Sequence, residues 1–314
     1  MPALLLAFRG LPEEKWARPL ATELPDLDIR CWPDIGRRED IADALVWKPE
    51  RGLLKSLPNL TAIFSRGAGV DHILEDPDLP DVPIIRFVDP DLTQRICEYA
   101  VLHVLFHHRR MLDYLAQQAE ATWRELRQPV AHKVNVGVMG LGVLGRAAAE
   151  RLHGLGFAVR GWSASKKDIP GIACFTGHEE LGAFLEGTDI LICLLPLTPE
   201  THRILDRKLF ARLRQDGPLG KPVLVNAGRG PLQVETDILA ALDDGTLGAA
   251  SLDVFEEEPL PRTSPLWRHP RVVVTPHNAA LTAPKAVTAH VADEIRKLEA
   301  GKALSNLIDR KRGY

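Results

Sequence analysis

The chain has 314 residues, of which 45% are hydrophobic, and this is long enough for two domains with separate cores. Its formal net charge of −3 provides no broad positive field, which argues against a nucleic-acid partner. The four cysteines form no CxxC pair, so we expect no disulfide framework and no structural metal site, as is typical of a cytoplasmic protein.

Short apolar runs alternate with amphipathic stretches along the whole chain. The first, MPALLLAFRG, has no basic residue before its apolar run and no small-residue cleavage site, so it predicts a β-strand and not a signal peptide. Later runs include LTAIFSR, VNVGVMG, DILICLLP, PVLVNAG and RVVVTPH. Such runs indicate parallel strands that are buried on both faces, and none approaches the ~18 apolar residues of a membrane span. The sequence therefore predicts an α/β protein with doubly wound parallel sheets and no membrane partner.

Two groups of β/α units predict two domains. Residues 1–98 contain several units, and a long helical pattern follows from about residue 98 to residue 125. A second strand–glycine–helix start begins at residue 134. We expect a flavodoxin-like substrate-binding domain of residues 1–98 and 284–314, and an inserted Rossmann domain of residues 99–283 that binds a dinucleotide.

Three segments outside the predicted site have simpler interpretations. His107 and His108 have no metal-like partners nearby, which favours a place at the surface or at an interface. The last helix, at about residues 284–300, is expected to cross back to the first domain. The basic run of residues 310–312 is interpreted as a solvated tail.

In the first domain, IFSRGAGVDHI predicts a strand, a glycine turn and the start of a helix. The turn from Arg66 to Gly69 would expose backbone N–H groups, which can hold a carboxylate. The alternative is a structural turn that is capped by Asp71.

The stretch VNVGVMGLGVLGRAAAERL carries Gly140, Gly142 and Gly145 in G-x-G-x-x-G spacing between a Val-rich strand and an Ala-rich helix. In a dinucleotide site, the first glycine permits the tight turn and the second lets the backbone approach the pyrophosphate. The third lets the helix pack closely on the strand, and the helix N-terminus offers N–H donors to the phosphates. The alternative is a tight turn without a ligand.

The next strand, FAVRGWSASKKD, has no carboxylate before Asp168, where an NAD site would hold the ribose hydroxyls with an acid. Ser163, Ser165, Lys166 and Lys167 would instead attract a 2′-phosphate. The sequence therefore predicts NADP as the cofactor, with NAD as the weaker one. The alternative is that the two lysines are ordinary loop residues.

Three ionisable residues follow predicted strands farther along the chain. Arg229 lies in NAGRG, Glu258 in LDVFEEEPLP and His277 in TPHNAA. Ligands of open parallel sheets bind outside the carboxyl ends of the strands, so all three can converge on a nicotinamide. Histidine is suited to donate a proton to a carbonyl oxygen, a neighbouring carboxylate favours the protonated imidazole, and arginine can bind a substrate carboxylate. Taken singly, each has an alternative as a structural or solvated residue.

These motifs resemble those of a known family. GAGVD, EYAV, GLGVLG, NAGRG, LDVFEEEPLP and TPH resemble, in the same order, the motifs of the D-2-hydroxyacid dehydrogenases. Within that family, ALVWKPE, MLDYLAQQAEATW, GWSASKK and the ending DRKRGY resemble the glyoxylate/hydroxypyruvate reductase A type. The resemblance covers nearly the whole chain.

The resemblance implies NADPH-dependent reduction of small 2-keto acids, namely glyoxylate to glycolate and hydroxypyruvate to D-glycerate. It implies that Arg229 binds the substrate carboxylate, that His277 is the acid and that Glu258 holds it. Further substrate contacts are implied for the backbone of Ala68 and Gly69, and for Trp47 and Arg95 at the substrate mouth. Residues that we also expect at the cofactor are Leu144, Leu195, Pro196, Asn226, Ala227 and Asp253.

The resemblance further implies a homodimer, because the family's dimers use the arm after the interdomain helix, and Trp123 on this arm would approach the neighbour's active site. The chain departs from the family at Ala164, where close relatives carry an arginine. Lysine point charges then replace a planar guanidinium fork, so we expect weaker selectivity for NADP.

Two other functions remain open from the sequence. One is a dinucleotide-sensing binding protein like the transcriptional corepressors that resemble these dehydrogenases, although the chain has no extended disordered tails for partners. The other is an NAD-dependent dehydrogenase of a different D-2-hydroxyacid, against which the missing ribose acid argues. The spacing of motifs does not reveal which keto acid is preferred.

Overall fold

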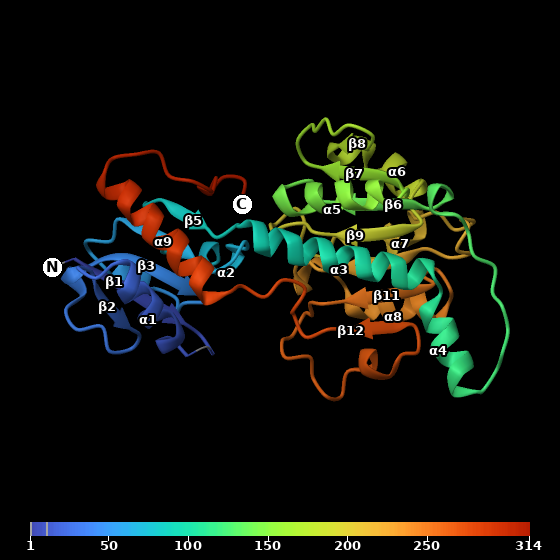
Figure 1. Ribbon diagram of the computed structural model, residues 1–314, viewed down its shortest axis with the longest axis horizontal. Coiled ribbons are helices and arrows are strands. Elements are labelled where there is room, and N and C mark those ends of the chain that lie inside the picture. The colour runs from blue at the N-terminus through green and yellow to red at the C-terminus, as the bar shows by residue number, and fades with distance from the viewer. Residues whose placement is uncertain (1, 11) are drawn as a thin grey trace. The chain divides into compact units, whose positions relative to one another are not determined.

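The computed structural model describes residues 2–10 and 12–314. The chain divides into two compact units, of which unit 1 consists of Met1–Leu92 and Leu281–Tyr314, and unit 2 of Thr93–Ala280. Each unit has a parallel sheet with helices on both faces (Figure 1). The predicted α/β class with two parallel-sheet domains is confirmed, and the units divide a few residues before the expected boundaries.

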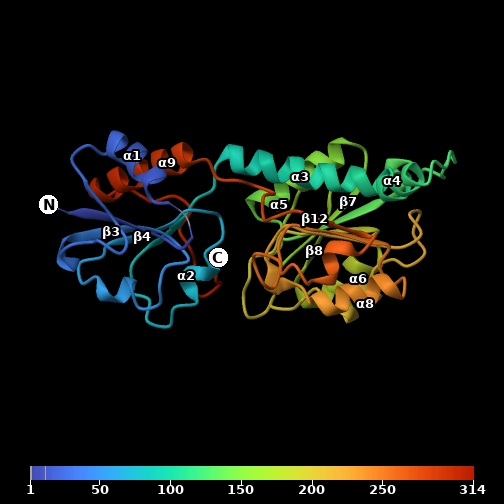
Figure 2. The same ribbon diagram turned by 90° about the horizontal axis from the view of Figure 1, so that it is seen from below.

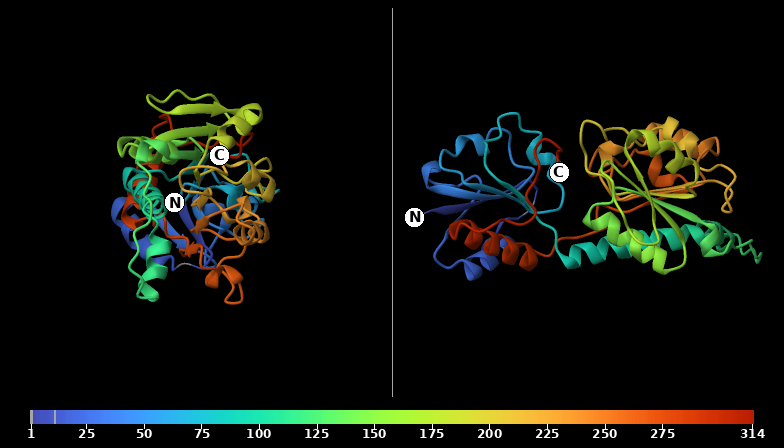
Figure 3. Two further views of the ribbon diagram at one scale, coloured as in Figure 1. Left: turned by 90° about the vertical axis from the view of Figure 1, so that its right-hand side faces the viewer. Right: turned by 90° about the horizontal axis from the view of Figure 1, so that it is seen from above.

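The sheet of unit 1 has five strands in the order β2-β1-β3-β4-β5, and all neighbours are parallel. This is the flavodoxin-like order. Helices α1 and α9 pack together on one face of the sheet and α2 lies on the other (Figures 2 and 3). The elements are β1 (Ala3–Phe8), α1 (Glu14–Glu23), β2 (Asp28–Cys31), β3 (Ile41–Trp47), β4 (Ala62–Ser65), α2 (Asp71–Leu74), β5 (Ile84–Arg86) and α9 (Pro284–Glu299).

The first predicted strand is confirmed as β1, whose six residues are all buried and which lies between β2 and β3 in the sheet. The last helix is confirmed as α9 and belongs to unit 1. The C-terminal run is not simply a solvated tail, because the Arg310 guanidinium donates hydrogen bonds to the carbonyl oxygens of Pro80 (2.6 Å) and Val82. Arg310 thus anchors the tail to the turn that precedes β5.

The sheet of unit 2 has seven parallel strands in the order β12-β11-β10-β9-β6-β7-β8. This is the doubly wound Rossmann order with one additional strand, and its switch point lies between β6 and β9. The strands are β6 (Asn135–Met139), β7 (Ala158–Ser163), β8 (Ala173–Thr176), β9 (Ile190–Cys193), β10 (Val223–Asn226), β11 (Ala249–Leu252) and β12 (Val272–Val274).

Helices α3 and α5 cover one face of this sheet, and α6 and α8 cover the other (Figure 2). The helices are α3 (Pro90–His108), α4 (Met111–Ala119), α5 (Val143–Gly154), α6 (Gly177–Glu186), α7 (Arg207–Arg212) and α8 (Glu235–Asp243). Short 3-10 turns occur at Arg38–Asp40, Leu54–Ser56, Ala131–Lys133, Gly230–Leu232 and Pro265–Arg268. In the part of the chain that the structure describes, no helix has the length and apolar character needed to cross a membrane.

The structure corrects three expectations about unit 2. The single helical pattern from 98 to 125 is two helices, because Arg110 takes a left-handed conformation (φ 58°) that ends α3 before α4 begins. His107 and His108 are buried rather than at the surface. Strand β12 is only half-buried, since it pairs with β11 alone and forms the edge of the sheet.

Candidate active site

The predicted catalytic residues of unit 2 lie in loops at one edge of its sheet. Because all seven strands are parallel, the loops that follow them emerge at the same edge. The relevant loops follow β6, β9, β10, β11 and β12, and they carry the glycine turn, Leu195 with Pro196, Asn226 to Arg229, Asp253 to Glu258, and Thr275 to Ala279.

The three glycines of the turn after β6 occupy different environments. Gly140 has φ +99°, and a Cβ there would lie 2.7 Å from the Leu194 carbonyl oxygen. A Cβ on Gly145 would lie 1.7 Å from the Gly140 carbonyl oxygen, so α5 packs directly on the turn. Gly142 has open space around its Cβ position and stands just before α5, whose first N–H groups have no partner within the helix. This arrangement fits a dinucleotide pyrophosphate.

Two buried amides fix the loop that carries Arg229. The Asn226 side chain donates to Gln233 (2.8 Å), and Gln233 donates to the Val254 carbonyl oxygen (2.9 Å). Gly230 lies so close to Phe255 that a Cβ would be 1.7 Å from its carbonyl oxygen. The loops after β10 and β11 are therefore locked together, with the half-buried Arg229 donating to the Gly228 carbonyl oxygen (2.9 Å).

The structure brings His277 and Glu258 together. The His277 imidazole Nδ1 lies 2.9 Å from Glu258 Oε2, although the two residues belong to loops after different strands. The other oxygen, Oε1, accepts a hydrogen bond from the Phe255 backbone N–H (3.2 Å), which orients the carboxylate. With 37% of its side chain exposed, the histidine retains access for a ligand at its remaining nitrogen.

Asp253 holds the turn on which His277 stands. Its buried carboxylate accepts hydrogen bonds from Thr275 Oγ1 (2.7 Å), Asn278 N–H (2.9 Å) and Ala279 N–H (2.9 Å). Its backbone oxygen accepts from His277 N–H (2.8 Å). Burial raises the pKa of this carboxyl from its usual value, and the hydrogen bonds oppose that rise.

This clamp explains an unusual backbone conformation. His277 has φ 51°, in the left-handed region that non-glycine residues rarely adopt. The contacts of Asp253 hold the residues on both sides of it, so the strain is retained in the folded protein. The family resemblance implied a place near the cofactor for Asp253. Its role in holding the turn left no signal in the sequence, because its partners lie 22 to 26 positions away.

Two further histidines of unit 2 are excluded as proton donors. His103 and His107 on α3 both contact Ser251 Oγ at 2.8 Å inside the unit. Burial lowers the pKa of His103 to about 4 and that of His107 to about 3, so both are neutral near pH 7. Their role is to anchor α3 on the sheet.

The residues expected at a 2′-phosphate lie at the end of β7. Ser165, Lys166 and Lys167 are exposed in the following turn. Ser163 is buried, and its hydroxyl donates a hydrogen bond to the Ser165 carbonyl oxygen (2.7 Å). The hydroxyl hydrogen of Ser163 is therefore engaged within the turn and is not offered to a phosphate. The exposed serine and the two lysines therefore remain as the better candidates for a phosphate.

The other predicted cofactor residues lie beside the switch point of the sheet. Leu195 is buried and Pro196 half-buried after β9, while Asn226 is buried and Ala227 half-buried after β10. Leu144 is half-buried in the first turn of α5. Arg95 is exposed on α3.

The predicted carboxylate cradle lies in unit 1, after β4. Ser65 Oγ donates to the Gly69 carbonyl oxygen (2.9 Å) and accepts from Gly67 N–H (3.3 Å), which closes the turn. Within residues 2–10 and 12–314, the structure records no hydrogen bond from the N–H groups of Ala68 and Gly69. Trp47, at the end of β3, lies against the same turn.

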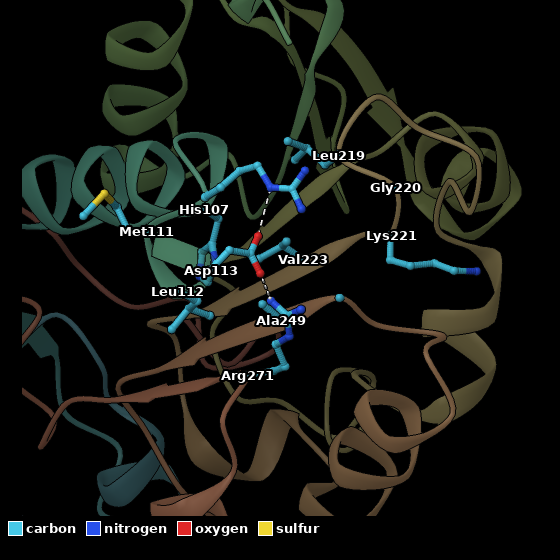
Figure 4. Close-up of a pocket in the computed structure, with 12 residues that line it drawn as sticks. His107, Met111, Leu112, Asp113, Leu219, Gly220, Lys221, Val223, Ala249 and Arg271 are labelled. Atoms are coloured by element: carbon cyan, nitrogen blue, oxygen red, sulfur yellow. Dashed lines mark hydrogen bonds and ion pairs between the residues drawn. The ribbon is translucent and has the colours of Figure 1, made fainter. Parts of the chain in front are cut away.

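A separate pocket of about 210 Å³ lies at the opposite edge of the unit 2 sheet. It is lined by the amino ends of β10, β11 and β12 and by the junction of α3 and α4. In it, the Asp113 carboxylate bridges Arg110 (2.9 Å) and Arg271 (2.6 Å), as Figure 4 shows. This pocket contains none of the predicted catalytic residues.

The described residues also contain no group of three or more His, Cys, Asp or Glu that could hold a metal ion.

The model of the family "D-isomer specific 2-hydroxyacid dehydrogenase, NAD binding domain" matches residues 101–279. The chain belongs to the D-isomer specific 2-hydroxyacid dehydrogenases. This D-2-hydroxyacid dehydrogenase is 42% identical over 308 residues to glyoxylate/hydroxypyruvate reductase A of Serratia proteamaculans, and 96% of each chain is covered. The resemblance predicted from the motifs is thereby confirmed.

Two solved structures of family members are also similar to this chain. A probable 2-hydroxyacid dehydrogenase from Rhizobium etli, in complex with NADP, HEPES and L(+)-tartaric acid, is 46% identical with a TM-score of 0.94, covering 100% of this chain and 99% of that one. The NADPH-dependent glyoxylate/hydroxypyruvate reductase of Sinorhizobium meliloti, in complex with NADP and sulfate, is 44% identical with a TM-score of 0.94, covering 100% of both chains.

Proposed function

We propose that this protein reduces small 2-keto acids with NADPH, converting glyoxylate to glycolate and hydroxypyruvate to D-glycerate. The observation that carries the proposal is the contact of His277 with Glu258 at the same sheet edge as the glycine turn. The similar reductases from Serratia and Sinorhizobium support the choice of substrates and cofactor. We place the reaction in the cytoplasm, in keeping with four cysteines that are all free.

The residues present fit NADPH. Gly140, Gly142 and the first turn of α5 would hold its pyrophosphate, and Lys166 with Lys167 would attract its 2′-phosphate. When bound, this cofactor supplies a hydride to the carbonyl carbon of the substrate.

His277 supplies the proton that balances the reduction. In the protonated imidazole, the Nδ1 hydrogen is donated to Glu258, which leaves the Nε2 hydrogen for the carbonyl oxygen of the substrate. The Glu258 carboxylate stabilises the imidazolium and fixes the ring orientation. Transfer of the proton leaves a neutral imidazole and a hydroxyl group, and the histidine is protonated again from solvent.

Arg229 would bind the substrate carboxylate through its planar guanidinium, which also orients the adjacent carbonyl. The N–H groups of Ala68 and Gly69 are further donors suited to a carboxylate. We assign Trp47 and Arg95 to the substrate mouth, and Asp253 to the cofactor side of the site through the turn that it holds.

The first test is the consumption of NADPH and NADH with glyoxylate, hydroxypyruvate and pyruvate. We expect kcat/KM for glyoxylate or hydroxypyruvate to be at least about tenfold higher with NADPH, because one charge-assisted hydrogen bond contributes about 1.5–3 kcal/mol. Equal efficiency with NADH would contradict the assignment of Lys166 and Lys167. Tight NADPH binding without turnover of any keto acid would favour a dinucleotide-sensing protein.

We also propose a homodimer, supported by apolar side chains that α3, α4 and the following arm leave exposed. Leu102 is 59% exposed, Leu115 49% and Trp123 102%. We expect sedimentation analysis to give twice the chain mass of 34.7 kDa. Leu115→Arg should shift the protein towards monomer, whereas Leu155→Arg, which replaces a leucine of 47% exposure after α5, should not. A monomeric parent protein would contradict the proposal.

A further inference from the structure

Arg66 of unit 1 lies in a stack of aromatic side chains. It follows β4, and its guanidinium carbon lies 4.6 Å from the ring centre of Trp47 and 5.3 Å from that of Trp16. Trp16 comes from α1 and Trp47 from the end of β3, so two elements hold the cation between indole faces. Cation–π contacts of this kind fix the plane of a guanidinium without using its N–H donors.

Among residues 2–10 and 12–314, no acid pairs with this half-buried cation. Within the described part of the chain, no ion pair or hydrogen bond is recorded for its guanidinium, and Nε is buried without an acceptor. Burial accordingly lowers the pKa of Arg66. Arg30 of the same unit shows the contrast, because Asp28 (2.8 Å) and Asp40 (3.0 Å) both pair with it.

A desolvated guanidinium without an acid is costly to the folded protein. An Arg66 with a purely structural role could be replaced by an apolar side chain of similar length, which would stack on the indoles without losing hydration. The arrangement is more readily explained if an anion from outside the chain completes the charge pair during function.

The position of Arg66 indicates which anion this would be. Arg66 directly precedes Gly67, Ala68 and Gly69, the turn assigned to the substrate carboxylate. Trp47 contacts both the turn and the cation. A Cβ on Gly67 would lie 3.1 Å from the Trp47 ring, and the Arg66 guanidinium lies over that same ring. The cation therefore stands beside the cradle, one indole ring away from the turn.

We propose that Arg66 selects 2-keto acids whose far end carries a second anionic group, either a carboxylate or a phosphate ester. This inference rests on the proposed reductase function and deepens it by naming a substrate class. Charge-assisted hydrogen bonds from the guanidinium to the distal group would favour such acids over neutral ones of the same size.

The test compares pairs of substrates with and without a distal anionic group. Oxaloacetate is paired with its neutral amide, 2-ketosuccinamate, and 3-phosphohydroxypyruvate is paired with hydroxypyruvate. We expect the wild-type protein to prefer the anionic member of at least one pair in kcat/KM, and the pair concerned distinguishes a carboxylate from a phosphate site. Arg66→Met should reduce that preference at least tenfold, and Arg66→Lys should give an intermediate value.

Arg51→Met is the matched control, because it removes one exposed cation from the same unit. Its preference should stay within twofold of the wild-type value, which separates local binding from a change in net charge. If Arg66 were merely structural, Arg66→Met would weaken all substrates alike and leave the ratio unchanged. A ratio within twofold of wild type would overturn the proposal, as would a wild-type protein without any preference for the charged member of either pair.

Binding of malonate, a diacid that cannot be reduced, separates this proposal from the reductase function. Calorimetry should show tighter binding of malonate than of its monoamide by at least tenfold, and loss of that difference in Arg66→Met. If no keto acid is reduced, the reductase proposal fails, and the malonate result alone decides on the anion site. If Arg66→Met does not fold, the ratio of kcat/KM for the charged substrate to that for its neutral partner is compared between Arg66→Lys and the wild type. A wild-type protein that shows no preference for the charged substrate would again contradict the proposal.

Discussion

Replacement of His277 by glutamine is expected to lower kcat for keto-acid reduction by about 10²–10⁴-fold, the usual contribution of a general acid. Glutamine can still accept or donate a hydrogen bond near Glu258, but it cannot deliver a proton to the carbonyl oxygen. The measurement is steady-state NADPH oxidation with glyoxylate, together with NADPH binding by fluorescence. Affinity for NADPH should change far less than turnover, because we assign the cofactor to the glycine turn and to the start of α5.

His132→Gln is the matched control for this variant, because His132 is exposed in a turn before β6, at the opposite edge of the sheet. It should retain wild-type turnover. Near-normal turnover of His277→Gln would remove His277 from the role of acid.

The glycine turn shows why part of this site could be predicted from the sequence. The roles of Gly140, Gly142 and Gly145 follow from local spacing between a strand and a helix, and the structure gives each glycine the environment expected. Alternation of apolar and amphipathic runs predicted parallel sheets, and parallel strands bring their following loops to one edge. The contact between His277 and Glu258 is a direct consequence of this topology.

Other features depend on tertiary contacts that leave no local pattern. The left-handed conformation of His277 is held by Asp253, whose partners lie on the loop after a different strand. The break at Arg110 interrupts a sequence that is helical on both sides. The sequence places Arg66 in a turn, and only the structure shows that its guanidinium lies against Trp16 and Trp47 and that its Nε is buried without an acceptor.

The support around His277 extends from its turn to the body of unit 2. Asp253 accepts the proton of Thr275 Oγ1, so the Tyr99 hydroxyl, 2.9 Å from that oxygen, must be the donor in its contact with Thr275. Burial raises the pKa of Tyr99 well above its usual value, so the phenol stays protonated near neutral pH. A chain of directed hydrogen bonds therefore ties α3 to the turn that presents the imidazole.

Replacement of Arg229 by alanine is expected to lower kcat/KM for glyoxylate by about 10²-fold or more. Each hydrogen bond between a guanidinium and a carboxylate contributes about 1.5–3 kcal/mol, and 1.4 kcal/mol corresponds to a factor of ten. Its loop is locked by Gln233 and by the close contact of Gly230 with Phe255, so the side chain can be removed while the loop stays in place. The loss should therefore reflect substrate binding and orientation rather than unfolding, which circular dichroism and thermal melting would verify.

The division of this loss between KM and kcat tests the role of Arg229 further. Binding of the carboxylate alone would raise KM for the keto acid, whereas orientation of the carbonyl towards His277 would also lower kcat. Arg229→Lys should recover only part of the loss, because an ammonium keeps the charge without the planar pair of donors. Arg207→Ala, which removes an exposed arginine paired with Asp244 on the surface of unit 2, should keep wild-type kinetics. Wild-type kinetics of Arg229→Ala would show that the substrate carboxylate is bound elsewhere, and would shift that role to the N–H groups of Ala68 and Gly69.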